Sequence, residues 1–524
     1  MYAKCGFLLK AQEFFDTLKV LNVVTWNALI GGYVLHGHGS TALRTLDRME
    51  GQGFAPNLIT FTFSFKACAC IRALEQGSEL HSNMLERGLP LDHIVITALV
   101  DMYAKCGALV KAQEAFDACF THDVATWNAL IVGYVQNECC EEALLCFEKK
   151  QTGGISPNAI TLACVLRACS LVKAVEKGKE IHAEVVQNGL LKADPFIGSA
   201  VVDMYAKCGA LSKAKEVLKV LPERDVVVWN SLIVGYVLHD YNEEALFCFD
   251  QMQAEGVSPN IVTYACSLNA CGNIGALEKG SEIHVDASRK ALLELALSIG
   301  SALVDMYAKC GALVKAQEAF DACFTHDVDT WNALIAGYVQ NECCEEALLC
   351  FEKKQTGGIS PNAITLACVL RACSLVKAVE KGKEIHTEVV QNGLLKADPF
   401  IRSAVVDMYA KCGALSKAKE VLKVLPERDV VVWNSLIVGY VLHDYNEEAL
   451  FCFDQMQAEG VSPNIVTYAC SVNACGNIGA LEKGSEIHAD ASRKALLELD
   501  LSIGSALVDM YAKCGELSKS SRRF

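Results

Sequence analysis

The chain has 524 residues, of which 52% are hydrophobic and 21% are charged, and its formal net charge at pH 7 is −15. This composition excludes a disordered polymer, and no run approaches the roughly 18 apolar residues that a membrane-spanning helix needs. The acidic balance also argues against nonspecific nucleic-acid binding, which depends on neutralising phosphates, although it allows a local basic stripe.

One hexapeptide, Met-Tyr-Ala-Lys-Cys-Gly, divides the chain into blocks of nearly equal length. It begins at Met1, Met102, Met204, Met306, Met408 and Met510, so the spacing is 101 residues once and 102 residues four times. A fixed period of this kind predicts stacked copies of one structural unit instead of a single large core. Its cysteine is expected to be a small buried residue at a packing position. Because both ends of the chain fall inside a repeat, we expect a piece of a longer array.

The elements expected in chain order are a partial repeat at 1–22, an array of complete helical hairpins at 23–500 and a partial repeat at 501–524. In the hairpin at 124–158, apolar residues lie at i, i+3, i+4 and i+7, which is one face of a first helix: Trp127, Leu130, Ile131 and Tyr134. A second helix follows from about Glu141, and Gly153-Gly154 and Pro157 end it.

Each block holds three such hairpins, of 35, 36 and 31 residues, and fourteen complete hairpins fit between Val23 and Asp500. No hairpin can bury its own apolar face alone, so neighbours must stack. The predicted fold class is all-α, a right-handed α-solenoid whose first helices line a concave face. In addition, residues 102–305 are duplicated as 306–509 with seven differences, among them Ala125/Asp329.

Two families of helical repeats have a period near 34 residues. The tetratricopeptide pattern matches at Trp127, Tyr134 and Pro157, but it requires a glycine where Ile131 stands. Under this alternative the chain would be a scaffold that binds protein or peptide partners, and its groove would lack periodic polar pairs.

Three recurring phrases closely resemble the pentatricopeptide repeat family over essentially the whole chain. They are Val-Val-Thr-Trp-Asn-Ala-Leu-Ile at Val23, Ala-Leu-Val-Asp-Met-Tyr-Ala-Lys-Cys-Gly at Ala98, and Leu-Pro-Glu-Arg-Asp at Leu221. The rotation of 35, 36 and 31 residues resembles the plant subclass with standard, long and short repeats, here without a recognisable C-terminal editing domain. The resemblance implies binding of single-stranded RNA in mitochondria or chloroplasts, for RNA processing or C-to-U editing, with editing factors as further partners and no membrane.

In that family one repeat reads one base, through the fifth residue of its first helix and the last residue of the repeat. The resemblance implies pyrimidine for the standard repeats, which pair Asn27 with Asn57, Asn128 with Asn158, Asn230 with Asn260, Asn332 with Asn362, and Asn434 with Asn464. It implies guanine for the short repeats, which pair Thr97 with Asp123, Ser199 with Asp225, Ser301 with Asp327, and Ser403 with Asp429.

Of the long repeats, only the pair Thr62 and Asp92 resembles the guanine type. The others have alanine as the fifth residue and are expected to discriminate poorly: Ala163 with Asp194, Ala265 with Ala296, Ala367 with Asp398, and Ala469 with Asp500. The expected target therefore repeats pyrimidine, any base and guanine.

Two further sets of residues follow from the resemblance. Second residues of first helices sandwich the base, which implies this role for Val24, Val227 and Val431; Asp329, Ser298 and Ser502 depart from the apolar pattern. Lysines near the ends of first helices are candidate phosphate contacts: Lys105, Lys207, Lys309 and Lys411, with Lys4 and Lys513 in the partial repeats. Their alternative role is to interact with the carbonyl end of the helix.

The sequence predicts no catalytic centre and no cofactor. His182-Ala183-Glu184 and His386-Thr387-Glu388 resemble half of a deaminase zinc motif, but no Cys-x-x-Cys occurs anywhere in the chain. Metal binding by these residues is therefore not expected, and this part of the protein should supply recognition without chemistry.

Overall fold

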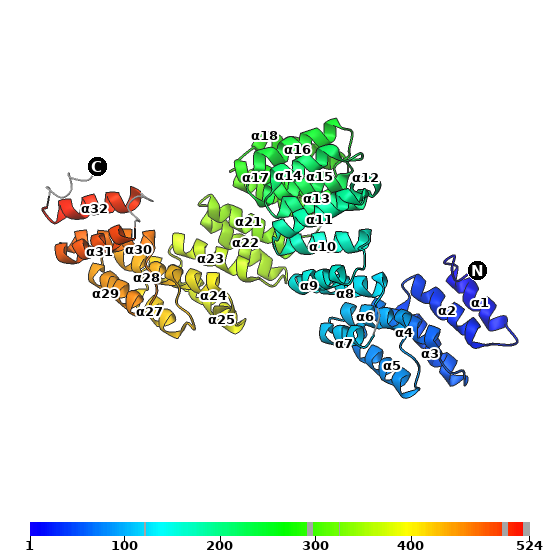
Figure 1. Cartoon of the computed structure of the whole chain (residues 1–524). Helices are drawn as coiled ribbons and strands as arrows, with labels where there is room; N and C mark the ends of the chain where they lie inside the picture. Colours follow the sequence, from blue (N-terminus) through cyan, green and yellow to red (C-terminus); the bar gives the residue numbers. More distant parts are fainter. Residues whose placement is uncertain (120–121, 291–296, 324, 495–500, 517–524) are drawn as a thin grey trace. The chain divides into compact units, whose positions relative to one another are not determined.

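The structure is a computed structural model that describes residues 1–119, 122–290, 297–323, 325–494 and 501–516 (Figure 1). Over these residues it consists of helices joined by short turns, with no strand. None of the helices within those ranges combines the length and apolar character that crossing a membrane requires. The chain divides into two compact units, Met1–Asn260 and Ile261–Phe524, which we describe separately.

Unit 1 is a succession of helical pairs. Its helices are α1 (Leu8–Thr17), α2 (Val23–Leu35), α3 (Gly39–Gly51), α4 (Leu58–Ile71), α5 (Leu74–Glu86), α6 (His93–Lys105), α7 (Leu109–Asp117), α8 (Val124–Gln136), α9 (Cys140–Thr152), α10 (Ala159–Leu171), α11 (Val175–Gln187), α12 (Leu190–Ala193), α13 (Pro195–Lys207), α14 (Leu211–Val220), α15 (Val226–Leu238) and α16 (Asn242–Ala254).

Unit 2 repeats the same pattern. Its helices are α17 (Ile261–Ile274), α18 (Leu277–Arg289), α19 (Leu297–Lys309), α20 (Leu313–Asp321), α21 (Val328–Gln340), α22 (Cys344–Thr356), α23 (Ala363–Leu375), α24 (Val379–Gln391), α25 (Leu394–Ala397), α26 (Pro399–Lys411), α27 (Leu415–Val424), α28 (Val430–Leu442), α29 (Asn446–Ala458), α30 (Ile465–Ile478), α31 (Leu481–Arg493) and α32 (Leu501–Lys513).

The first helices of successive pairs lie side by side within each unit. In unit 1 these are α2, α4, α6, α8, α10, α13 and α15, and each contacts the next. The second helix of a pair packs against its own first helix and, in most pairs, against the first helix that follows, as α3 does with α2 and α4. The result in each unit is a layer of first helices backed by second helices, in which each repeat buries the apolar face of its neighbour.

The first helices are started by side-chain caps. In twelve of them the residue before the helix is an Asn or Asp whose side chain accepts a backbone N–H of the first turn, as Asn57 does from Thr60 N at 3.0 Å. Such a cap stabilises a helix by about 1 kcal/mol. The same Asn or Asp is the last residue of the preceding repeat, so it belongs to both repeats.

The recurring hexapeptide forms the joint between three successive repeats. In the copy that begins at Met204, the Met204 side chain covers Gly178 of the preceding repeat so closely that a Cβ there would collide with its sulfur. The Tyr205 hydroxyl lies 3.0 Å from His182 Nδ1, also in the preceding repeat. On the other side, a Cβ on Gly235 of the following repeat would lie 2.5 Å from the Ala206 Cβ. The hexapeptide is therefore a packing element.

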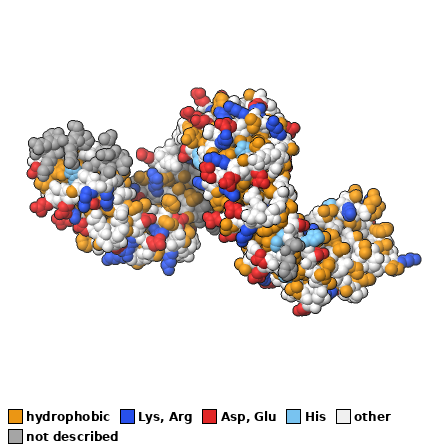
Figure 2. Space-filling model, viewed as in Figure 1, with side chains coloured by type: hydrophobic (Ala, Val, Ile, Leu, Met, Phe, Trp, Pro, Cys, Tyr) orange, Lys and Arg blue, Asp and Glu red, His pale blue; other side chains and the backbone are white. Residues whose placement is uncertain are grey.

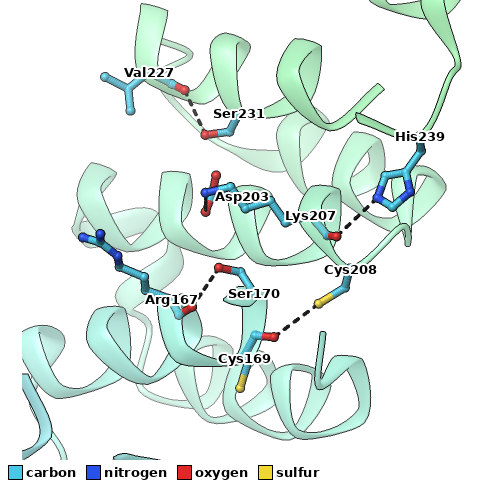
Figure 3. A network of polar contacts seen from close by, with 9 residues as sticks. All are labelled: Arg167, Cys169, Ser170, Asp203, Lys207, Cys208, Val227, Ser231 and His239. Carbon is cyan, nitrogen blue, oxygen red and sulfur yellow. Dashed lines mark hydrogen bonds and ion pairs between the residues drawn. The ribbon is translucent and has the colours of Figure 1, made fainter. Parts of the chain in front are cut away.

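The hexapeptide cysteines are not core residues, which corrects the expectation from the sequence. Cys208 is half-buried, and its thiol donates to the Cys169 carbonyl at 3.6 Å, while the Lys207 carbonyl lies 3.2 Å from His239 Nε2 (Figure 3). The fully buried thiol is that of Cys169 in the preceding long repeat. Burial raises its pKa to about 12, with the nearby Cys208 adding to the shift.

Candidate nucleic-acid interface

A groove on the first-helix face of unit 1 brings the predicted reading positions together. It is lined by α4, α6 and α8, and its wall includes Thr97 and Asp123 of one predicted pair and Asn128 of the next. Ile94 and Ala125, the second residues of α6 and α8, complete the wall beside them. The second and fifth residues of adjacent first helices therefore share one surface.

The two asparagines of each standard repeat are joined directly. The fifth residue of the first helix donates from Nδ2 to Oδ1 of the last residue of the repeat, at distances between 2.9 and 3.1 Å in all five repeats. The fifth residues are buried, with 6–9% of their surface exposed. The pairing predicted from the sequence is thus a physical contact.

A threonine in the next first helix fixes the orientation of both amides. In the first repeat, the Thr60 hydroxyl donates to Asn27 Oδ1 at 2.7 Å and lies 3.0 Å from Asn57 Oδ1, which also accepts the Thr60 backbone N–H. Both amide oxygens thereby accept hydrogen bonds from within the protein. The groups that remain for a ligand are the Asn57 N–H₂ and the second N–H of Asn27, so the pair is a hydrogen-bond donor.

In two short repeats a threonine also bridges the predicted pair. Thr97 Oγ1 lies 2.7 Å from Thr126 Oγ1, which donates to Asp123 Oδ1 at 2.8 Å. Burial alone would raise the pKa of Asp123, but the hydrogen bonds from Thr126 and the nearby His93 outweigh it and hold the pKa below its ordinary value. The carboxylate therefore acts only as an acceptor. Ser301, Thr330 and Asp327 form the same arrangement in unit 2.

The other predicted guanine pairs are not joined by such a bridge. Valine, which has no hydroxyl, stands at the bridging position after Asp225 and Asp429, and the Ser199 and Ser403 hydroxyls donate to carbonyls of their own helices. The Thr62 hydroxyl likewise donates to the Leu58 carbonyl, at 2.8 Å. Asp92, the predicted partner of Thr62, caps α6 by accepting the Val95 backbone N–H. Two of the weakly discriminating pairs include Ala296 or Asp500, which lie outside the described residues.

The predicted sandwiching residues are exposed. Val24 is 72% exposed, Val227 53% and Val431 52%, and Asp329 is also exposed. The sequence interpretation missed eight further exposed apolar residues at the same position of other first helices: Ile59, Ile94, Ile160, Phe196, Val262, Ile364, Phe400 and Val466. The signal that would have found them is their place two residues after the capping Asn or Asp. Because they recur at one position of successive first helices, these exposed side chains form a candidate binding surface.

The four candidate phosphate-binding lysines are ion-paired. Lys105, Lys207, Lys309 and Lys411 each lie 2.7–2.9 Å from an aspartate four residues earlier in the same helix. Such exposed pairs contribute about 0.3–0.5 kcal/mol, so an incoming phosphate can compete with them. Acidic and basic side chains are interspersed over the face shown in Figure 2.

Long repeats offer further cations that the sequence interpretation did not single out. Lys66, Arg167 and Arg371 are exposed ninth residues of α4, α10 and α23, and Lys66 belongs to the groove wall. Figure 3 shows Arg167 on α10, which packs against α13, the helix that carries the ion pair of Asp203 and Lys207.

Histidines of the long repeats have structural partners. His182 and His386 lie 3.0 and 3.1 Å from the hydroxyls of Tyr205 and Tyr409, and burial, with a smaller effect of a nearby lysine, lowers their pKa. Within the described ranges, no three His, Cys, Asp or Glu side chains are grouped so that they could hold a metal ion.

Comparison with protein families finds repeat matches along the chain. The PPR repeat family matches residues 21–70, 224–273 and 428–477, and a second description, PPR repeat, matches residues 125–155, 329–359 and 401–430. These segments begin at or close to the first helices of standard or short repeats.

Several proteins of Arabidopsis thaliana are similar over almost the full chain. One pentatricopeptide repeat-containing protein is 34% identical over 526 residues, which cover 99% of this chain and 72% of the relative. A chloroplastic one is 34% identical over 525 residues, which cover 100% of this chain and 54% of the relative. A mitochondrial one is 32% identical over 540 residues, which cover 99% of this chain and 59% of the relative. The chain therefore spans little more than half the length of these two organellar relatives.

Among solved structures, the pentatricopeptide repeat protein PPR10 from maize is similar with a TM-score of 0.65 and 20% identity, over 99% of this chain and 81% of that chain. PPR10 in complex with an 18-nt psaJ RNA element is similar with a TM-score of 0.54 and 19% identity, over 99% of this chain and 77% of that chain. At these identities the likeness concerns the fold, and it confirms the predicted α-solenoid of stacked hairpins.

Proposed function

Because the chain belongs to the pentatricopeptide repeat family, we propose that it binds single-stranded RNA sequence-specifically and reads one base per repeat. It would serve as the RNA-recognition part of organellar RNA processing or C-to-U editing, in mitochondria or chloroplasts. The RNA-bound structure of PPR10 and the chloroplastic and mitochondrial relatives support this proposal. Family membership decides against the tetratricopeptide alternative.

The observation that carries the proposal is the donor character of the asparagine pairs. Asn27 and Asn57 have both amide oxygens occupied and present N–H groups. Uracil and cytosine both carry a carbonyl acceptor on the Watson–Crick edge, whereas adenine has no carbonyl oxygen and two of the three Watson–Crick groups of guanine are donors. The five standard repeats are therefore assigned to pyrimidines.

The aspartates of the short repeats have the opposite character. Asp123 is ionised and accepts only, and Thr126 occupies one of its two oxygens. Guanine carries N–H donors on its Watson–Crick edge, so it fits a carboxylate better than a base with acceptors there. The exposed apolar second residues would lie against the base faces, and the lysines and arginines of the first-helix face would contact phosphates.

Binding to two RNAs of equal composition tests the proposal. One RNA repeats pyrimidine, adenine and guanine in register with the repeats, and the other is shuffled so that the three-base period is lost. We expect the ordered RNA to bind at least about tenfold more tightly at one salt concentration, since each wrong base costs about 1–3 kcal/mol. Equal binding of the two RNAs would contradict one-base-per-repeat reading, and capture of a peptide without RNA would revive the scaffold alternative.

A further inference from the structure

Two lysines are buried beneath asparagine pairs. Lys150 on α9 and Lys354 on α22 have no exposed surface, although lysine is almost never fully buried without a partner. Burial lowers the pKa of both side chains, and a nearby glutamate opposes the shift in each case. An ammonium group held in such a place costs free energy, so its presence calls for a physical reason.

Each lysine donates to the threonine that orients the asparagine pair above it. Lys150 Nζ lies 3.0 Å from Thr161 Oγ1, and the Thr161 hydroxyl lies 2.5 Å from Asn128 Oδ1 and 2.9 Å from Asn158 Oδ1. In unit 2, Lys354 Nζ lies 2.9 Å from Thr365 Oγ1, which contacts its asparagine pair in the same way. The ammonium group is therefore two hydrogen bonds away from the amides that would face the base.

The other three standard repeats lack the lysine and keep the pair. Met49, Met252 and Met456 stand at the equivalent position, each one block length from the nearest of the two lysines, and all three are fully buried. The asparagines of those repeats are nevertheless joined at 2.9–3.0 Å, compared with 3.0–3.1 Å above the lysines. The lysine is thus not needed to form the pair, and what distinguishes it from the methionines is its charged hydrogen-bond donor.

We propose, on the basis of the RNA-reading function above, that Lys150 and Lys354 are positioning residues that sharpen pyrimidine selection at their two repeats. The ammonium group donates to Thr161 Oγ1, and the Thr161 hydroxyl donates to Asn128 Oδ1, as the Thr60 hydroxyl does to Asn27 Oδ1 in a repeat without the lysine. Hydrogen bonds in such a chain polarise one another, which makes the amide N–H groups stronger donors. A buried positive charge acts in the same direction, because it favours a base with a carbonyl oxygen, which both pyrimidines have and adenine lacks.

The proposal is tested with the full chain and the variant Lys150→Met, which copies the repeat that contains Met252. Each pyrimidine of the ordered RNA is replaced in turn by adenine, and the ratio of the two affinities is measured at every position. We expect Lys150→Met to lower this ratio about fivefold at one pyrimidine position and to leave the others unchanged, because a charged hydrogen bond is replaced by none. A purely structural role would lower binding of all RNAs together.

Two controls keep the outcome clear. Thermal unfolding should show Lys150→Met to be at least as stable as the original chain, because a buried charge is removed. The variant Lys354→Met should act in the same way at a different single position. If the Lys150→Met protein is folded and its pyrimidine-to-adenine affinity ratios are all unchanged, the proposed role of the lysine is wrong. The proposal that each repeat reads one base would not be affected by that result. If the original chain itself shows no preference at any position, both proposals fail.

Discussion

The specificity of one standard repeat can be reversed by copying the short-repeat geometry into it. Thr467 already occupies the bridging place above Asn434 and Asn464, as Thr126 does above Thr97 and Asp123. The double variant Asn434→Thr, Asn464→Asp therefore replaces a donor pair by a bridged carboxylate and leaves the rest of the repeat untouched.

The cost to stability is small. The aspartate introduced by Asn464→Asp would still cap α30, because Asn464 accepts the Thr467 backbone N–H at 3.1 Å and aspartate is an equally good cap. The variant loses one hydrogen bond of 2.9 Å between the asparagines, and the new threonine can reach Thr467. The net loss in the free energy of unfolding should be about 1 kcal/mol or less.

The change in specificity should be larger. Each preference is worth about 1–3 kcal/mol, or roughly 5- to 150-fold, so a preference for pyrimidine should become a preference for guanine of similar size at that position. Competition binding with RNAs that differ at this one base, at fixed salt, measures it, and Asn464→Asp alone should give an intermediate ratio. A folded double variant that still prefers pyrimidine would refute the donor and acceptor reasoning.

Three further changes have expected outcomes. Gly235→Val places side-chain atoms against the hexapeptide joint, so it should lower the free energy of unfolding, measured by urea titration, by about 1–3 kcal/mol. The control Gly51→Val, where nothing lies within 4 Å of an added Cβ, should not cause this loss. Asp329→Val should tighten RNA binding and Ala125→Asp should weaken it, as filter binding would show; equal affinities would argue against base contact at this position. Burial holds the pKa values of four histidines below the ordinary 6.5: His81, His182, His284 and His386. As the pH falls, the unfolded chain therefore binds protons before the folded chain does, so the free energy of unfolding should be full above about pH 6.5 and decline below it. An unchanged urea midpoint between pH 7.5 and 5.5 would contradict this role of the histidines.

The spacing of apolar residues in the sequence was sufficient to predict where the main helices of the array begin. The first helix expected from Val124 begins there, and the second helix expected from about Glu141 begins one residue earlier, at Cys140. Apolar spacing and turn residues are local signals, which explains this success. The four-residue helices α12 and α25 were not expected, because four residues carry no periodic pattern.

The candidate site was predictable only in part. The asparagine pairs could be located because they recur at fixed places, but their bond to each other and to Thr60 depends on how two repeats stack. Lys150, which is fully buried, was not singled out from the sequence, because nothing there distinguishes a buried lysine from an exposed one. Likewise, the hexapeptide cysteines were expected in the core, yet the helix places Cys208 at its end, where the thiol reaches a carbonyl.

The residue shared by two repeats restricts how the target sequence can evolve. Under the proposed function, the side chain that would contribute to base choice also starts the next helix, and Ser, Thr, Asp and Asn are the residues with side chains that cap well. A change from Asn to Asp, as between Asn158 and Asp123, keeps the cap and alters the hydrogen-bonding character. Most other replacements would lose about 1 kcal/mol of helix stability as well. An exchange between Asn and Asp at this position would therefore change the proposed base preference at little structural cost, whereas residues that cap poorly would also destabilise the next helix.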